Sequence, residues 1–219
     1  VVSGKVTPDG RPLLWKNRDT DFMQNHIDYV KGEKYNFIAV VNSANTYLKE
    51  AWMGTNSSGF ALMNTQSYNL VDVKGDEERG AANGRVIYRA LEVCATVEDF
   101  CHFLDTISKP SDIEANFGVI DAQGGAAMFE VDYHKYVMYD ANNPKDAPYG
   151  YIARTNFSFA GKVNEGAGYV RYMEADQVLM KASATGSITP QFIFNDLSRS
   201  FRNRMLDIDL RSGAYNRPQ

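Results

Sequence analysis

The sequence predicts an α+β fold in which strands and helices occupy separate runs of the chain. Strand-like segments come first, two helical segments follow, a second group of strands comes next, and two more helical segments lie near the end. Runs of this kind favour antiparallel sheets over an alternating α/β arrangement. Two sheets stacked face to face, with helices on both outer sides, would bury the apolar faces of all four layers. Since no linker or repeat interrupts the chain, we expect a single domain over residues 1–219.

The strands are predicted from apolar or β-branched runs that end at turn residues. Pro8-Asp9-Gly10 and Asn56-Ser57-Ser58-Gly59 have the composition of hairpin turns, and Asp121-Ala122-Gln123-Gly124 has it too. The expected strands cover 1–6, 12–15, 35–42, 51–55, 60–64, 117–120, 126–131, 136–139 and 149–155.

The helices are predicted from apolar residues at helical spacing and from capping residues. Thr96 with Asp99 resembles a capping box, and Thr189-Pro190 places a cap before a proline at the first helical position. The expected helices cover 84–94, 97–104, 169–182, and 190 through Phe201.

Composition and motifs exclude several classes of protein. Hydrophobic residues make up 44% and charged residues 23%, which is a globular balance. The net charge of −4 gives no general attraction to nucleic acid or anionic membranes. The apolar runs are far shorter than the ~18 residues of a membrane span. The sequence contains no P-loop, G-x-G-x-x-G, G-x-S-x-G or Cys/His zinc pattern, so it gives no sign of a cofactor.

The segment Lys16-Asn17-Arg18-Asp19 places four polar residues directly after an apolar strand. A strand that runs into solvent explains this pattern, and composition alone favours that reading because charged residues are mostly exposed. Polar groups directed at a site near the chain start would also explain it. Asp19, Asp21 and His26 suggest a metal cluster, but a local turn would be needed to bring the two carboxylates onto one ion. A solvated loop is therefore favoured, and no metal site is predicted.

Several segments, taken in chain order, resemble the choloylglycine hydrolase family. That family contains bile salt hydrolases and penicillin V acylases, and it is related to the acyl-coenzyme A:6-aminopenicillanic acid acyltransferases. All are N-terminal nucleophile hydrolases, so the resemblance implies a four-layer αββα sandwich with antiparallel sheets. The similar segments are 16–19, 56–64, 91–104, 116–130, 153–156, and the helix from Arg171-Tyr172, which resembles an Arg-Tyr helix of the acyltransferase branch.

The resemblance implies hydrolysis of linear amides by an N-terminal cysteine, without a cofactor. The free α-amine would take the thiol proton, and autoproteolytic removal of any upstream peptide would free that amine. The family's cysteine corresponds here to the residue just before Val1, so the nucleophile is not in this sequence. Lys16 stands where bile salt hydrolases have arginine, and we expect the last strands of the family's fold to be missing.

The resemblance also implies roles for individual residues. The charge of Lys16 would favour the thiolate, Asp19 would orient the amine, and Asn64 with Asn156 would form the oxyanion hole. Arg171 would contact the substrate. The remaining residues expected to line the acyl pocket are Phe22, Met23 and Tyr68.

The expected substrate is a small N-acyl amine or N-acyl amino acid of the bile-salt or penicillin V type. Acyl transfer to an amine is an alternative, and so is a non-catalytic binding subunit, because the chain itself holds no nucleophile. A homo-oligomer, or a second fragment that completes the fold, would be a further partner. The start of the chain without Met favours a periplasmic or secreted protein, with a cytoplasmic one as the alternative.

Overall fold

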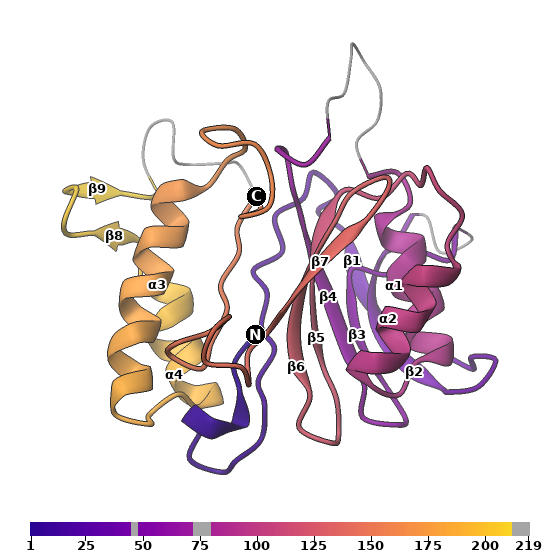
Figure 1. Cartoon of the computed structure of the whole chain (residues 1–219), viewed down its shortest axis with the longest axis horizontal. Helices are drawn as coiled ribbons and strands as arrows, with labels where there is room; N and C mark the ends of the chain where they lie inside the picture. Colours follow the sequence, from indigo (N-terminus) through magenta and orange to yellow (C-terminus); the bar gives the residue numbers. More distant parts are fainter. Residues whose placement is uncertain (45–47, 72–79, 212–219) are drawn as a thin grey trace.

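The computed structural model describes residues 1–44, 48–71 and 80–211, and over these it has the predicted α+β architecture (Figure 1). A seven-stranded antiparallel sheet runs in the order β1 to β7, so each strand pairs with its neighbours in sequence. Its strands are β1 Asn25–Val30, β2 Phe37–Asn42, β3 Met53–Asn56, β4 Ala61–Gln66, β5 Ala115–Ile120, β6 Ala126–Val131 and β7 Tyr136–Asp140. A short pair, β8 Arg202–Asn203 and β9 Ile208–Asp209, follows near the end.

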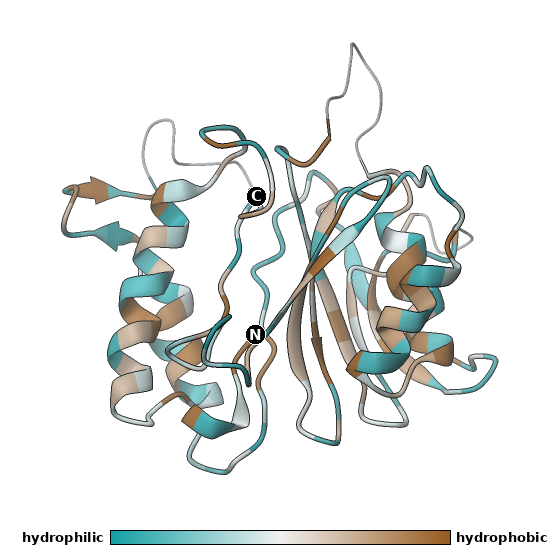
Figure 2. Cartoon of the chain, in the orientation of Figure 1, coloured by the Kyte–Doolittle hydropathy of each residue, from teal (hydrophilic) through white to brown (hydrophobic). Residues whose placement is uncertain are grey.

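Helices α1 (Asn83–Val93) and α2 (Val97–Thr106) cover one face of the sheet (Figure 1). The predicted capping box is confirmed, because the Thr96 side chain accepts from the Asp99 backbone N–H and the Asp99 side chain accepts from that of Thr96. Phe100 of α2 lies at the centre of an aromatic cluster, with ring centroids 5.0 Å from Phe129 and 5.9 Å from Phe117. Hydrophobic and hydrophilic residues mix along these helices in Figure 2, as expected where one side meets a core.

The other face of the sheet is covered by extended segments rather than by a complete second sheet. Val2 lies between two partners and forms isolated bridges to Leu13 and Tyr151. These segments approach the sheet closely at Gly118, where a Cβ would stand 2.9 Å from a methyl group of Val1. The second β layer of the expected sandwich is therefore present as a short three-segment ladder.

Two helices cover the outside of this ladder, α3 (Tyr169–Ala184) and the short α4 (Pro190–Asn195) (Figure 1). Their buried residues Leu179 and Ile193 share a core with Val2 and Tyr151. The order of layers is thus helices, sheet, ladder, helices, which is the αββα order. None of the described helices is long and apolar enough to cross a membrane.

The structure corrects several boundaries. β1 was not predicted, and His26, expected in a loop, lies in this strand. The predicted strand 149–155 is ordered by a single bridge at Tyr151. The last helix does not continue to Phe201, because α4 ends at Asn195 and a 3-10 turn, η3 (Leu197–Arg199), follows.

The position of Phe100 predicts a large loss of stability on truncation. Phe100→Ala should lower the free energy of unfolding by about 3–5 kcal/mol, because it removes a fully buried ring and leaves a cavity. Chemical denaturation would measure the change. Phe194→Ala, which removes a ring that is 68% exposed, is the matched control and should cost far less. Equal costs for the two substitutions would contradict this description of the core.

Candidate active site

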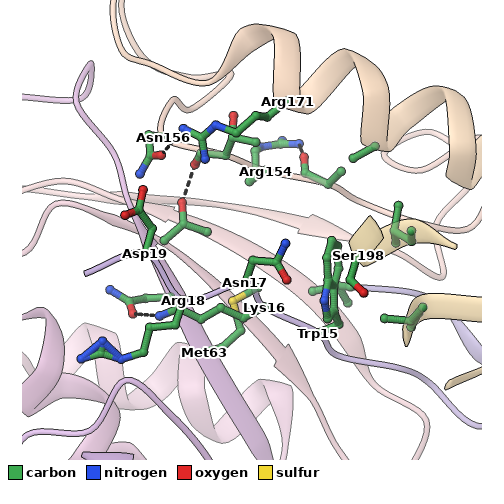
Figure 3. A pocket seen from close by; sticks show the side chains of 18 of the residues that line it. Trp15, Lys16, Asn17, Arg18, Asp19, Met63, Arg154, Asn156, Arg171 and Ser198 are labelled. Carbon is green, nitrogen blue, oxygen red and sulfur yellow. Dashed lines mark hydrogen bonds between the residues drawn. The ribbon is translucent and has the colours of Figure 1, made fainter. Parts of the chain in front are cut away.

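A cavity of about 630 Å³ opens where the first residues of the chain meet the inner face of the sheet. Its walls come from segments far apart in sequence, namely the chain start, residues 13–20, the end of β4, residues 152–156, and α3 with η3. Figure 3 shows the side chains that project into it. The predicted residues that line the cavity are Lys16, Asp19, Phe22, Asn64, Tyr68, Asn156 and Arg171.

The first residue of the chain lies in the central strand of the ladder. The Val1 nitrogen donates to the Ile152 carbonyl oxygen at 2.9 Å, and the Ile152 N–H donates to the Val1 carbonyl at 2.8 Å. Burial, with a smaller contribution from the charge of Arg154, lowers the pKa of the Val1 amine to about 5. The chain start is therefore held in a desolvated position on the cavity wall.

Lys16 is a half-buried cation on the cavity wall. Its Nζ donates to the side-chain oxygen of Asn64 and to the Trp52 carbonyl, each at 3.0 Å. Burial first, and then the neighbouring charge of Arg18, lowers the pKa of Lys16 to about 7. The structure therefore brings Lys16 and Asn64 into direct contact, although they are 48 residues apart in sequence.

Asn156 and Arg171 form a second group on the cavity wall. Arg171 Nη2 donates to Asn156 Oδ1 at 2.8 Å, and Asn156 Nδ2 donates to the Gln66 carbonyl at 2.9 Å. Figure 3 shows Asp19 on the same side of the cavity as Asn156. Asn156 is thus held from both ends of its amide, with one contact from α3 and one from β4.

The aromatic and apolar residues predicted to bind substrate are placed less uniformly. Tyr68 and Phe22 reach the cavity wall, and Phe22 is half exposed. Met23 is not among the lining residues and its side chain is largely exposed. Among the described residues no group of three His, Cys, Asp or Glu side chains could hold a metal ion.

Sequence reasoning missed the buried ion pair behind the site. Arg154 Nε lies 2.6 Å from Glu130 Oε1, with the two side chains 3% and 0% exposed. The Glu130 carboxylate also accepts the backbone N–H groups of Phe159 and Ala160. The signal was available, because strand alternation directs Glu130 of β6 away from the buried neighbours that face α2.

A second buried polar group, Asn116 of β5, pairs with Glu130 across the sheet. Its Nδ2 donates to the carbonyls of Thr155 and Phe157, while its Oδ1 accepts from Ser158. Together, Glu130 and Asn116 fasten the segment that carries Asn156 to the main sheet.

The sequence profile of the family described as acyl-coenzyme A:6-aminopenicillanic acid acyl-transferase matches residues 6–184. The chain belongs to this family. Family membership places it in the N-terminal nucleophile hydrolase superfamily. No curated protein matches the chain significantly.

Two solved structures are similar to this chain. A variant of conjugated bile acid hydrolase from Clostridium perfringens is 12% identical with a TM-score of 0.50, over 84% of this chain and 75% of the hydrolase. Penicillin V acylase from Agrobacterium tumefaciens is 18% identical with a TM-score of 0.48, over 80% of this chain. The chain spans 62% of the length of that acylase.

The Glu130–Arg154 pair predicts a strong response to loss of one charge. Glu130→Gln should lower the free energy of unfolding by about 3–5 kcal/mol, because it leaves a buried guanidinium without its carboxylate. Glu33→Gln, which breaks a solvent-exposed pair with Arg89, is the control and should cost about 1 kcal/mol or less. Denaturant titration of both variants gives the comparison, and a small cost at Glu130 would show that the pair is not needed.

The low pKa of Lys16 predicts a pH-dependent contribution to stability. Between its folded pKa of about 7 and its ordinary value of 10.5, the unfolded state binds a proton that the folded state does not. Stability from this group should therefore rise with pH in that window, by up to about 1 kcal/mol per pH unit. Unfolding of the protein and of Lys16→Met across pH 7–10 would show it, and a pH-independent difference would contradict it.

Proposed function

We propose that the protein is an amidase that cleaves linear amide C–N bonds through a cysteine joined to the nitrogen of Val1. The observation that carries this proposal is the register of the ladder. Val2 bridges Leu13 and Tyr151, and Val1 pairs with Ile152. One step further along the same register, the residue before Val1 would lie between Trp15 and Ala153. Both of these residues line the cavity.

The environment of the Val1 nitrogen supports a peptide bond at this position. A buried charged amine is costly, whereas a peptide N–H needs a single acceptor. The Ile152 carbonyl supplies that acceptor at 2.9 Å. A peptide nitrogen would therefore keep the observed hydrogen bond without burying a charge.

The surrounding groups fit nucleophilic attack on an amide. The α-amine of the cysteine would take the thiol proton, and the thiolate would attack the substrate carbonyl carbon. Lys16 in its protonated form would favour the thiolate. The tetrahedral oxyanion would be stabilised by amide groups of Asn64 and Asn156, with Asp19 orienting the amine. Collapse would break the C–N bond, pass the proton to the leaving amine and leave a thioester for water to hydrolyse.

The proposed substrates are small N-acyl amines or N-acyl amino acids, with the acyl part near Phe22 and Tyr68 and with Arg171 as a further contact. Hydrolysis is proposed ahead of acyl transfer to an amine, although the matching family is described as acyl-transferases. Product analysis with and without an added amine acceptor separates the two reactions. A non-catalytic binding subunit is the remaining alternative.

Intact-mass spectrometry of the full-length mature protein tests the nucleophile. After incubation with a panel of N-acyl amides, the protein should gain the mass of one acyl group, located by peptide mapping to a cysteine preceding Val1. A mature protein with no cysteine, serine or threonine before Val1 would rule out the proposed chemistry and favour the binding subunit.

Substitution of either proposed oxyanion-hole residue should cause a large loss of turnover. Asn64→Ala and Asn156→Ala should each lower kcat by about 10²–10³-fold with the fold retained, since each removes a donor to the oxyanion. Asn195→Ala, at the exposed end of α4, is the matched control and should retain activity. Steady-state kinetics with circular dichroism makes the comparison. Turnover like that of the unmodified protein in either site variant would remove that residue from the oxyanion hole.

A further inference from the structure

One corner of the cavity carries positive charge without a matching carboxylate. Lys16 and Arg18 are two residues apart in a segment without regular secondary structure, and both line the cavity. Figure 3 shows both extending toward the same side of the cavity, away from Ser198. Over the described ranges of the chain, no acidic side chain lies within ion-pair distance of either cation. Burial first, and then the nearby charge of Arg18, lowers the pKa of Lys16.

Arg18 is fixed by two neighbours that leave part of its guanidinium unused. Its Nη2 donates to Asn42 Oδ1 at the end of β2, at 2.5 Å. Its Cζ lies 5.1 Å from the ring centroid of Trp52, just before β3. These contacts hold the guanidinium in one orientation, which is the state in which arginine binds a planar anion best.

Two buried donors at this corner have no acceptor among the described residues. They are Arg18 Nε and the indole Nε1 of Trp52, and both residues line the cavity. Buried polar groups are nearly always hydrogen-bonded, because an unmet donor costs free energy. Two donors beside an uncompensated charge call for an anionic acceptor.

The other cations of the cavity are engaged differently. Arg154 is paired with Glu130, Arg171 donates to Asn156, and Arg211 is paired with Asp209. The corner formed by Arg18 and Trp52 is therefore distinct from the group that holds Asn156. A purely structural arginine would be expected to meet a carboxylate or carbonyl at Nε, and Arg18 meets neither within the described chain.

We propose that Arg18 and Trp52 form a subsite that binds a carboxylate group of the substrate. The inference rests on the proposed function of the cavity and narrows its substrates to amides that carry an acidic group. The guanidinium would supply charge and hydrogen bonds, and the indole N–H would supply a neutral donor. The carboxylate would stand either on the acyl part or on the amine part of the amide, and the two cases differ in the test below.

Isothermal titration calorimetry of residues 1–219, which lack the proposed cysteine and so leave amide ligands intact, tests the subsite without requiring turnover. N-phenylacetylglycine carries its carboxylate on the amine part, and N-phenylglutaramic acid carries it on the acyl part. The primary amide of each acid is the uncharged match. At least one acid should bind about tenfold more tightly than its amide, as expected for a charge-assisted pair. The acid that shows this preference identifies the end of the substrate that bears the charge.

Variants then assign the preference to the two residues. Arg18→Gln should abolish it, and Trp52→Phe, which keeps an aromatic ring and removes the N–H, should weaken it several-fold. Arg11→Gln, which removes an exposed positive charge elsewhere, is the control and should retain it. Circular dichroism would check that each variant is folded.

Three results would overturn the subsite: equal affinity for acid and amide, no measurable binding of either acid, or an acid preference that survives in Arg18→Gln. Failure of the proposed function gives a different pattern. In that case the acids would bind as expected, while full-length protein would form no acyl-enzyme.

Discussion

The contact between Glu130 and Arg154 is the constraint on which the candidate site depends. It joins the inner face of the main sheet to the segment that carries Asn156, and Asn116 joins the same segment one strand away. Most of the interface between the two layers is apolar and would permit small sliding movements. Hydrogen bonds to buried charges and amides oppose such sliding, because each shift would leave a buried polar group without its hydrogen-bond partner. The ion pair thus fixes position more than it adds stability.

The electrostatics of the cavity follow from where its cations are anchored. Arg154 forms an ion pair with the buried Glu130 carboxylate, whereas Lys16 donates to neutral oxygens of Trp52 and Asn64. Neutral acceptors bind a lysine without cancelling its charge, so its effect remains available inside the cavity. This arrangement suits a site in which negative charge develops during the reaction and also resides on the ligand.

Local pattern predicted most of the main sheet and both helices that cover it. The hairpin turn at residues 56–59, the capping box at Thr96 and the start of the last helix at Pro190 are confirmed, because short-range chemistry determines them. Strand β1 was missed because two of its large apolar side chains, Ile27 and Tyr29, are exposed at the sheet edge. The contacts of Lys16 with Asn64, and of Arg154 with Glu130, connect distant segments, so periodicity could not reveal them. The family resemblance identified the candidate residues, and the structure shows which atoms they contact.

The ladder around Val2 fixes the position of the first residues along the cavity wall. Bridges on both sides hold residues 1–3 in register, while the turn over 4–12 lies outside this pairing. A longer or shorter turn could be accommodated without moving Val1. A single residue inserted between Val1 and Val2 would instead exchange inward and outward side chains and push the preceding residue past Trp15. An inserted residue should therefore disrupt the site between Val1 and Val2, whereas an insertion in the turn over residues 4–12 should leave the site intact.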